Sequence, residues 1–126
     1  METNSPPRIL IIEDEIPLST AMSARFRLEG IDAVAVYNGS DAVEALKKDK
    51  FNLVLLDLML PDINGFQILE KKREMGLTTP VLVMTVLSQP EDEKRAMSLG
   101  ATEYLKKGDI SLADIVDKAK GYINKK

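Results

Sequence analysis

The sequence predicts one α/β domain, a doubly wound parallel sheet of five strands in the order 2-1-3-4-5 with five helices. Five strand-like segments alternate with five helix-like segments along 126 residues, which is room for a single domain of this kind. The most apolar strand segments are continuous runs, as expected for strands that helices cover on both faces. Turn residues and candidate helix caps separate these segments.

The first half of the chain contains three strand candidates and two helix candidates. In chain order they are 9–12, 17–30, 31–36, 40–46 and 53–56. Pro17 suits the first turn of a helix, where its missing N–H is not needed, and Gly30 ends that helix. Asp32 weakens the second strand, which we therefore place near an edge of the sheet. Asn38 or Ser40 is expected to cap the second helix.

The second half contains three helix candidates and two strand candidates. In chain order they are 65–74, 81–84, 90–99, 101–106 and 111–123. Pro90 and the three acidic residues after it favour a helix start, although that helix has few apolar residues. Ser111 and Asp114 form a capping arrangement before the clearest amphipathic stripe in the chain.

The composition excludes several kinds of chemistry. The chain has no cysteine and no histidine, which excludes disulfides, thiolate zinc sites, histidine ligands and Ser-His-Asp catalysis. Lys and Arg total 17 against 20 Asp and Glu, and the net charge of −3 disfavours binding of bare nucleic acid. Without a signal peptide or an apolar run of membrane-spanning length, we expect a cytoplasmic protein with no membrane contact.

Three carboxylates follow the ends of two strands that the predicted order makes neighbours. Glu13 and Asp14 follow the first strand, and Asp57 follows the third. Because the carboxyl ends of parallel strands meet at one edge of the sheet, we expect these side chains to lie close together. Carboxylates that close repel one another unless a cation lies between them, and all-oxygen ligands suit Mg²⁺. The sequence therefore predicts a Mg²⁺ site at this edge.

Two further residues with useful chemistry follow the remaining strands. Thr85 ends the fourth strand, and Lys107 follows the fifth. Asp62, Asp92 and Asp109 are interpreted as ordinary loop, helix-start and capping residues. No glycine-rich phosphate-binding motif competes for this edge, which disfavours dinucleotide binding and nucleotide hydrolysis.

Four motifs give the chain, from Arg8 to its final helix, a resemblance to the receiver domain of two-component response regulators, which has a flavodoxin-like fold. Together at their spacings these motifs are highly specific. They are IIEDE at 11–15, DLMLPDINGF at 57–66, VMT at 83–85 and GATEYLKK at 100–107.

The resemblance implies that Asp57 accepts a phosphoryl group from a partner histidine kinase or histidine phosphotransfer protein in a Mg²⁺-dependent reaction. The implied Mg²⁺ ligands are Glu13, Asp14, Asp57 and the backbone carbonyl of Met59, with Asp14 the more direct of the acidic pair. Lys107 would pair with the phosphoryl group, where its charge and that of Mg²⁺ offset anionic repulsion. Such a domain is a signalling module that catalyses only its own phosphorylation and dephosphorylation.

Thr85 and Tyr104 are the switch residues that the resemblance implies. The Thr85 hydroxyl would move to the phosphoryl group and vacate space for a new Tyr104 rotamer; the alternative for Tyr104 is a plain half-buried aromatic. Few apolar residues anchor the segment 90–99, and elements of low stability are those that move. We expect the fourth helix, fifth strand and fifth helix to form the output face for a downstream protein. Receivers often pair through this face when phosphorylated.

Two other functions fit part of the pattern. A Mg²⁺-dependent phosphatase with an Asp nucleophile typically carries a second Asp two residues later as general acid, but Met59 stands there and has no proton to donate. A degenerate receiver that binds partners without phosphate would lack part of the acidic, hydroxyl and lysine set, and that set is intact here.

One departure from the family pattern concerns the backbone after Lys107. Gly108 stands where many receivers have a proline, commonly after a cis bond. A cis Lys-Gly bond would cost about 3 kcal/mol, so we expect a trans or a strained bond. Residues 1–7 are expected to be a disordered lead-in and residues 8–126 the receiver domain.

Overall fold

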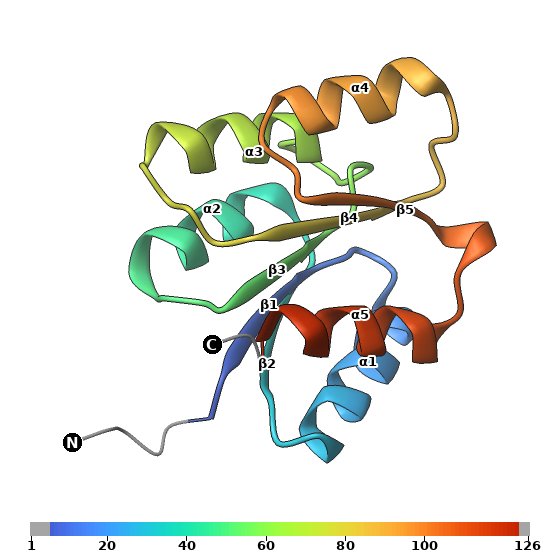
Figure 1. Cartoon of the computed structure of the whole chain (residues 1–126). Helices are drawn as coiled ribbons and strands as arrows, with labels where there is room; N and C mark the ends of the chain where they lie inside the picture. Colours follow the sequence, from blue (N-terminus) through green and yellow to red (C-terminus); the bar gives the residue numbers. More distant parts are fainter. Residues whose placement is uncertain (1–5, 124–126) are drawn as a thin grey trace.

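The computed structural model describes residues 6–123, which form one five-stranded sheet in the order β2-β1-β3-β4-β5 (Figure 1). Every neighbouring pair of strands is parallel. The strands are β1 (Arg8–Ile12), β2 (Asp32–Val36), β3 (Leu53–Leu56), β4 (Val81–Thr85) and β5 (Glu103–Lys106). The predicted fold class and strand order are confirmed, and β2 lies at an edge as expected.

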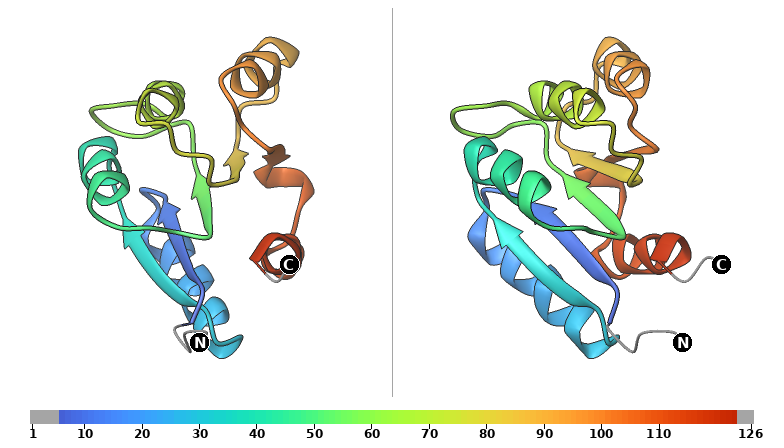
Figure 2. Two further views of the ribbon diagram at one scale, coloured as in Figure 1. Left: turned by 60° about the vertical axis from the view of Figure 1, so that its left-hand side comes forward. Right: turned by 90° about the vertical axis from the view of Figure 1, so that its left-hand side faces the viewer.

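Helices cover both faces of the sheet, which makes three layers (Figure 2). They are α1 (Ile16–Leu28), α2 (Gly39–Lys48), α3 (Gly65–Glu74), α4 (Pro90–Ser98) and α5 (Leu112–Ile123). Helices α1 and α5 pack on one face through residues such as Phe26 and Val116. The other face carries α2, α3 and α4, with Leu46 and Ile68 in its core. Because β1, β3 and β4 are covered on both sides, their apolar residues form continuous runs.

The helix starts follow the predicted signals with small differences. Helix α1 begins one residue before Pro17. Asn38, rather than Ser40, caps α2 by accepting a hydrogen bond of 2.8 Å from the backbone N–H of Asp41. The Ser111 hydroxyl accepts a bond of 3.1 Å from the N–H of Asp114, as the capping pattern predicts.

Two segments need separate description. A short 3₁₀ helix, η1 (Lys107–Asp109), follows β5 and was not predicted. The peptide bonds of the described residues are all trans, which agrees with the expectation for Gly108. Of the expected lead-in, residues 1–5 lie outside the described residues. The carbonyl of Pro7 accepts a hydrogen bond of 2.8 Å from the N–H of Asp32 at the start of β2.

Helix α4 is the most weakly anchored helix of the fold. Ala96 is its single buried residue, whereas each of the other helices buries at least three. Three acidic residues in its first turn interact favourably with the helix dipole. The interaction of these acidic residues with the helix dipole therefore contributes to the stability of α4, where apolar packing contributes less than in the other helices.

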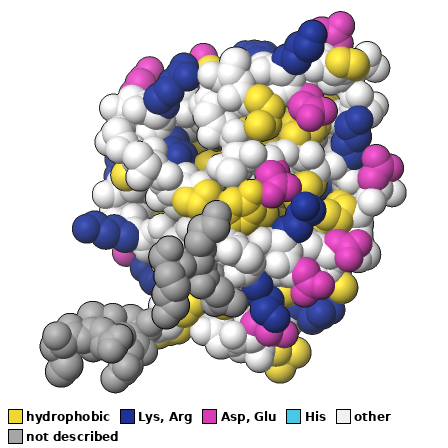
Figure 3. Space-filling model, in the orientation of Figure 1, with side chains coloured by type: hydrophobic (Ala, Val, Ile, Leu, Met, Phe, Trp, Pro, Cys, Tyr) yellow, Lys and Arg dark blue, Asp and Glu magenta, His cyan; other side chains and the backbone are white. Residues whose placement is uncertain are grey.

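Charges of both signs are mixed on one face of the molecule. On the face shown in Figure 3, acidic and basic side chains are interspersed without a patch of one sign.

None of the helices in the described residues has both the length and the apolar character needed to span a bilayer.

We predict that Leu55→Ala lowers the free energy of unfolding by about 2–5 kcal/mol, because it leaves a cavity in the central strand. Leu55 is fully buried. The matched control is Leu28→Ala at the exposed end of α1, where the side chain is 82% exposed and a change within about 0.5 kcal/mol is expected. Urea unfolding of both variants measures the difference, and equal losses would contradict the assigned core.

Candidate functional site

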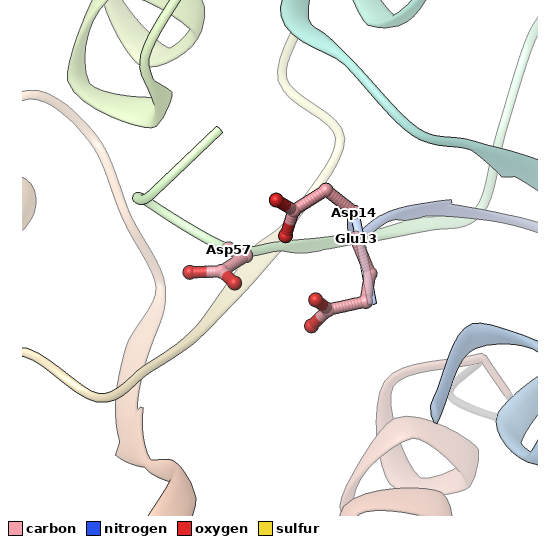
Figure 4. Close-up of side chains that lie close together, drawn as sticks. All are labelled: Glu13, Asp14 and Asp57. Atoms are coloured by element: carbon pink, nitrogen blue, oxygen red, sulfur yellow. The ribbon is translucent and has the colours of Figure 1, made fainter. Parts of the chain in front are cut away.

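Three carboxylates meet at the carboxyl edge of the sheet. Glu13 and Asp14 follow β1, and Asp57 follows β3. The two strands are paired, and the N–H of Asp57 donates a hydrogen bond of 3.0 Å to the carbonyl of Ile12. One oxygen atom from each carboxylate lies within 4.8 Å of the others, and the side chains approach one another in Figure 4. The structure therefore brings together the acidic residues that the sequence predicts to converge.

The three carboxylates differ in exposure. Glu13 is fully buried and Asp57 is 3% exposed, whereas Asp14 faces solvent. Burial raises the pKa of Glu13 above its ordinary value, against the opposing effects of Lys107 and of the Glu15 N–H, which donates to Glu13 Oε2. The carboxyl groups of Glu13 and Asp57 therefore line the inner part of the site, and Asp14 lies at its entrance.

Lys107 supplies the positive charge inside the site. Its ammonium lies 2.8 Å from Oε1 of Glu13, 2.9 Å from Oδ2 of Asp57 and 3.3 Å from Oε2 of Glu15. Burial opposes the charge of this ammonium, but its bonds to Glu13 and Asp57 prevail and raise the pKa of Lys107 above its ordinary value. The η1 turn, which starts at Lys107, places this side chain at the site without a proline after it.

The loop after β3 carries Met59 and is held at both of its ends. The N–H of Met59 donates a hydrogen bond of 3.0 Å to Oδ1 of Asp57. At the far end, the N–H of Gly65 donates 2.9 Å to the carbonyl of Leu58. A Cβ at Gly65 would lie 2.6 Å from the Leu58 Cα, so only glycine allows this approach. Asn64 and Gln67 form a capping box that starts α3 at this point.

Thr85 and Tyr104 are connected through one loop residue, Leu87. The buried Thr85 hydroxyl accepts a hydrogen bond of 3.2 Å from the Leu87 N–H. The Tyr104 hydroxyl donates a bond of 2.9 Å to the carbonyl of the same residue. Burial, together with the nearby charges of Asp92 and Glu93, raises the pKa of Tyr104. Both predicted switch residues therefore contact the loop that leads into α4.

Two residues near the site were not identified from the sequence. Glu15 extends the acidic group and forms an ion pair with Lys107. The sequence signal that could have identified Glu15 is its position directly after Glu13 and Asp14. Asp62, interpreted as an ordinary loop residue, has a left-handed backbone with φ 63° and accepts hydrogen bonds from the start of α2. No pattern in the sequence marks that contact.

Residues 9–120 match the family model of the response regulator receiver domain, so the chain belongs to this family. It is a receiver domain of two-component signal transduction, a signalling module whose family binds Mg²⁺ through acidic residues.

Two curated relatives are transcriptional regulatory proteins that are longer than this chain. The chain is 40% identical over 100 residues to the transcriptional regulatory protein CiaR of Streptococcus pneumoniae, covering 79% of this chain and 44% of that protein. It is 31% identical over 121 residues to the transcriptional regulatory protein TrcR of Mycobacterium tuberculosis, covering 96% and 47%. The chain thus spans about half the length of these curated relatives.

A solved structure supports the same assignment. The non-phosphorylated HemR receiver domain from Leptospira biflexa superposes with a TM-score of 0.86 at 28% identity, covering 95% of this chain and 96% of that one.

We predict that Lys107→Ala lowers the free energy of unfolding by about 3 kcal/mol at neutral pH without Mg²⁺, because the buried Glu13 and Asp57 lose the cation that pairs with them. The loss should shrink on acidification. The pKa of Glu13 is already raised from 4.5, and loss of the cation raises it further, so protonation favours the folded variant. The part of the deficit that Glu13 causes is therefore full above the raised pKa of Glu13 in the variant and is lost below pH 4.5, so the total deficit becomes smaller.

The control for this prediction is Lys106→Ala, which removes a neighbouring lysine that has no ion pair among the described residues. Its stability should stay within about 0.5 kcal/mol of the unsubstituted chain. Urea unfolding across pH 4–8 makes the comparison. A Lys107 deficit that stays constant with pH would show that the carboxylates do not depend on this cation.

Proposed function

We propose that Asp57 is the phosphoacceptor of this receiver and takes a phosphoryl group from a partner histidine kinase or histidine phosphotransfer protein. The observation that carries the proposal is the placement of Asp57 between two acidic neighbours and a half-buried lysine. Without histidine, the chain itself has no phosphohistidine to supply the group.

The acidic residues form the metal site of the proposal. Glu13, Asp14 and Asp57, with the backbone carbonyl of Met59, offer the all-oxygen ligands that Mg²⁺ prefers. Two of the carboxylates are buried and mutually repulsive, which makes a divalent cation the natural partner of the set. When bound, Mg²⁺ would neutralise charge on the phosphoryl oxygens during transfer.

Asp57 and Lys107 perform the chemistry that belongs to the chain. A carboxylate oxygen of Asp57 attacks phosphorus, the bond from phosphorus to the donor breaks, and its electron pair leaves with the donor. The hydrogen bond from the Met59 N–H to Oδ1 orients the carboxylate, so that Oδ2 faces Lys107. The Lys107 ammonium also contacts the phosphoryl oxygens, and its positive charge lowers the repulsion between the Asp57 carboxylate and the phosphoryl group.

The proposed switch works through Leu87, because Thr85 and Tyr104 each form a hydrogen bond with its backbone. A phosphoryl group on Asp57 adds negative charge that attracts the Thr85 hydroxyl as a donor. Movement of Thr85 breaks its bond to the Leu87 N–H, and Tyr104, which holds the Leu87 carbonyl, must then readjust. Because α4 follows this loop and buries only Ala96, it can shift at low cost.

The output face of the proposal consists of α4, β5 and α5. It would contact a downstream protein or a second phosphorylated copy, rather than nucleic acid, in keeping with the net charge of −3. CiaR and TrcR are named transcriptional regulatory proteins, so a longer protein built on this receiver would carry the signal to transcription. Exchange with a kinase in this role places the domain in the cytoplasm. The phosphatase alternative has no support, because Met59 has no proton to donate.

We predict that acetyl phosphate with Mg²⁺ adds one phosphoryl group to the chain, as measured by intact-protein mass. Asp57→Asn should abolish the addition, because the amide is not a nucleophile for phosphorus. The matched control is Asp109→Asn, an exposed residue of η1, which should label like the unsubstituted chain. Labelling that persists in Asp57→Asn, or that needs no Mg²⁺, would contradict the proposal.

We predict that an acyl-phosphate mimic at Asp57 changes amide hydrogen exchange across residues 86–110, which include Leu87, α4 and Tyr104. The expected change reflects the weak packing of α4 and its connection to Thr85 through Leu87. Residues of β1 are the internal control and should keep their protection. Unchanged exchange throughout residues 86–110 would contradict the proposed switch.

A further inference from the structure

The loop between β3 and α3 is fastened in its middle to the start of α2. Asp62 accepts a hydrogen bond of 2.9 Å from the Gly39 N–H at its Oδ1 atom and one of 2.7 Å from the Ser40 hydroxyl at its Oδ2 atom. These are donors at the first two positions of α2, which lie more than twenty residues away in the sequence. A carboxylate at this point also interacts favourably with the positive end of the helix dipole.

The geometry of the contact leaves little freedom. Asp62 holds φ at 63°, a left-handed backbone that Asp and Asn adopt more readily than other side chains. A Cβ at Gly39 would lie 2.5 Å from the Cβ of Ile63, so the start of α2 packs closely on this loop. The bond to Ser40 is the main cause of a lowered pKa of Asp62, which keeps the carboxylate charged.

The contact matters because Met59 lies on the same loop. Asp57 and Gly65 fix the two ends of this loop, and the Asp62 contacts fix the span between them. The carbonyl of Met59 is three residues from Asp62 and is the one backbone ligand in the proposed Mg²⁺ set. A backbone ligand has no rotamer of its own, so its position depends wholly on the conformation of the loop.

We propose that Asp62 is a positioning residue for the metal site: by bonding to Gly39 and Ser40 it fixes the loop that presents the Met59 carbonyl. This rests on the proposed function, in which that carbonyl is a Mg²⁺ ligand. Helix α2 thereby becomes part of the support of the site, although none of its side chains belongs to the set of metal ligands.

The test measures Mg²⁺ binding to the 126-residue chain by the change of the Met59 and Asp14 amide signals during MgCl₂ titration. Asp62→Gly removes both acceptors but allows the left-handed backbone, and should raise the dissociation constant about three- to tenfold. Asp62→Asn removes the charge but keeps an acceptor oxygen and the left-handed preference, and should restore affinity most of the way. Ser40→Ala removes one of the bonds and should have a smaller effect than Asp62→Gly.

Two controls separate positioning from other effects. Asp41→Asn removes a charge from the same turn of α2 without touching the loop, and should leave the dissociation constant unchanged. Urea unfolding without Mg²⁺ reports stability, so a stability loss in Asp62→Gly with unchanged Mg²⁺ affinity would overturn the inference. Equal weakening in Asp62→Asn and Asp62→Gly would also overturn it, because charge alone would then explain the effect. If the unsubstituted chain binds no Mg²⁺, the proposed function itself fails.

Discussion

Repulsion between carboxylates is the constraint on which the site depends. Pairing of β1 with β3 places Glu13, Asp14 and Asp57 at one edge of the sheet, with an oxygen of each within 4.8 Å of the others. Carboxylates this close repel one another, and the repulsion is screened least between the two buried ones, Glu13 and Asp57. The fold tolerates this cost because Lys107 touches two of the three carboxylates. Any cation that enters the site therefore relieves a strain already present in the folded chain.

The same geometry explains how a local change reaches the surface. Thr85 and Tyr104 lie on neighbouring strands, and each bonds to a different backbone group of Leu87. A shift of one side chain therefore alters the support of the other without a long series of intermediates. Helix α4 follows directly and is held by a single buried residue, whereas the opposite layer of α1 and α5 packs through a continuous apolar core.

The sequence was sufficient to predict the features that depend on local residue pattern or on strand order. Continuous apolar runs identified β1, β3 and β4, and the alternation of elements predicted the order that brings Asp57 beside Glu13. It was insufficient where the decisive contact joins distant segments. The Lys107 contact with Glu15 spans 92 positions, and the Asp62 contacts with Gly39 and Ser40 span 23 and 22 positions. Roles in phosphoryl transfer came from the resemblance, because single strand-end residues carry no such information.

The net charge of the site differs between its metal-free, Mg²⁺-bound and phosphorylated states. If the exposed Glu15 is left out, the three clustered carboxylates and Lys107 have a net charge of about −2 when all are ionised, and one Mg²⁺ would bring this to zero. Replacing the Asp57 carboxylate by an acyl phosphate of nearly two negative charges makes the site negative again. Thr85 is a buried hydroxyl at this edge, and the proposed switch assigns the donation of a hydrogen bond to this excess negative charge to it. The Thr85 hydroxyl accepts its present bond from the Leu87 N–H, and in the proposed switch a displacement of the side chain toward the phosphoryl group would break that bond. In the proposed function, the signal would therefore be a consequence of incomplete neutralisation of charge at the site.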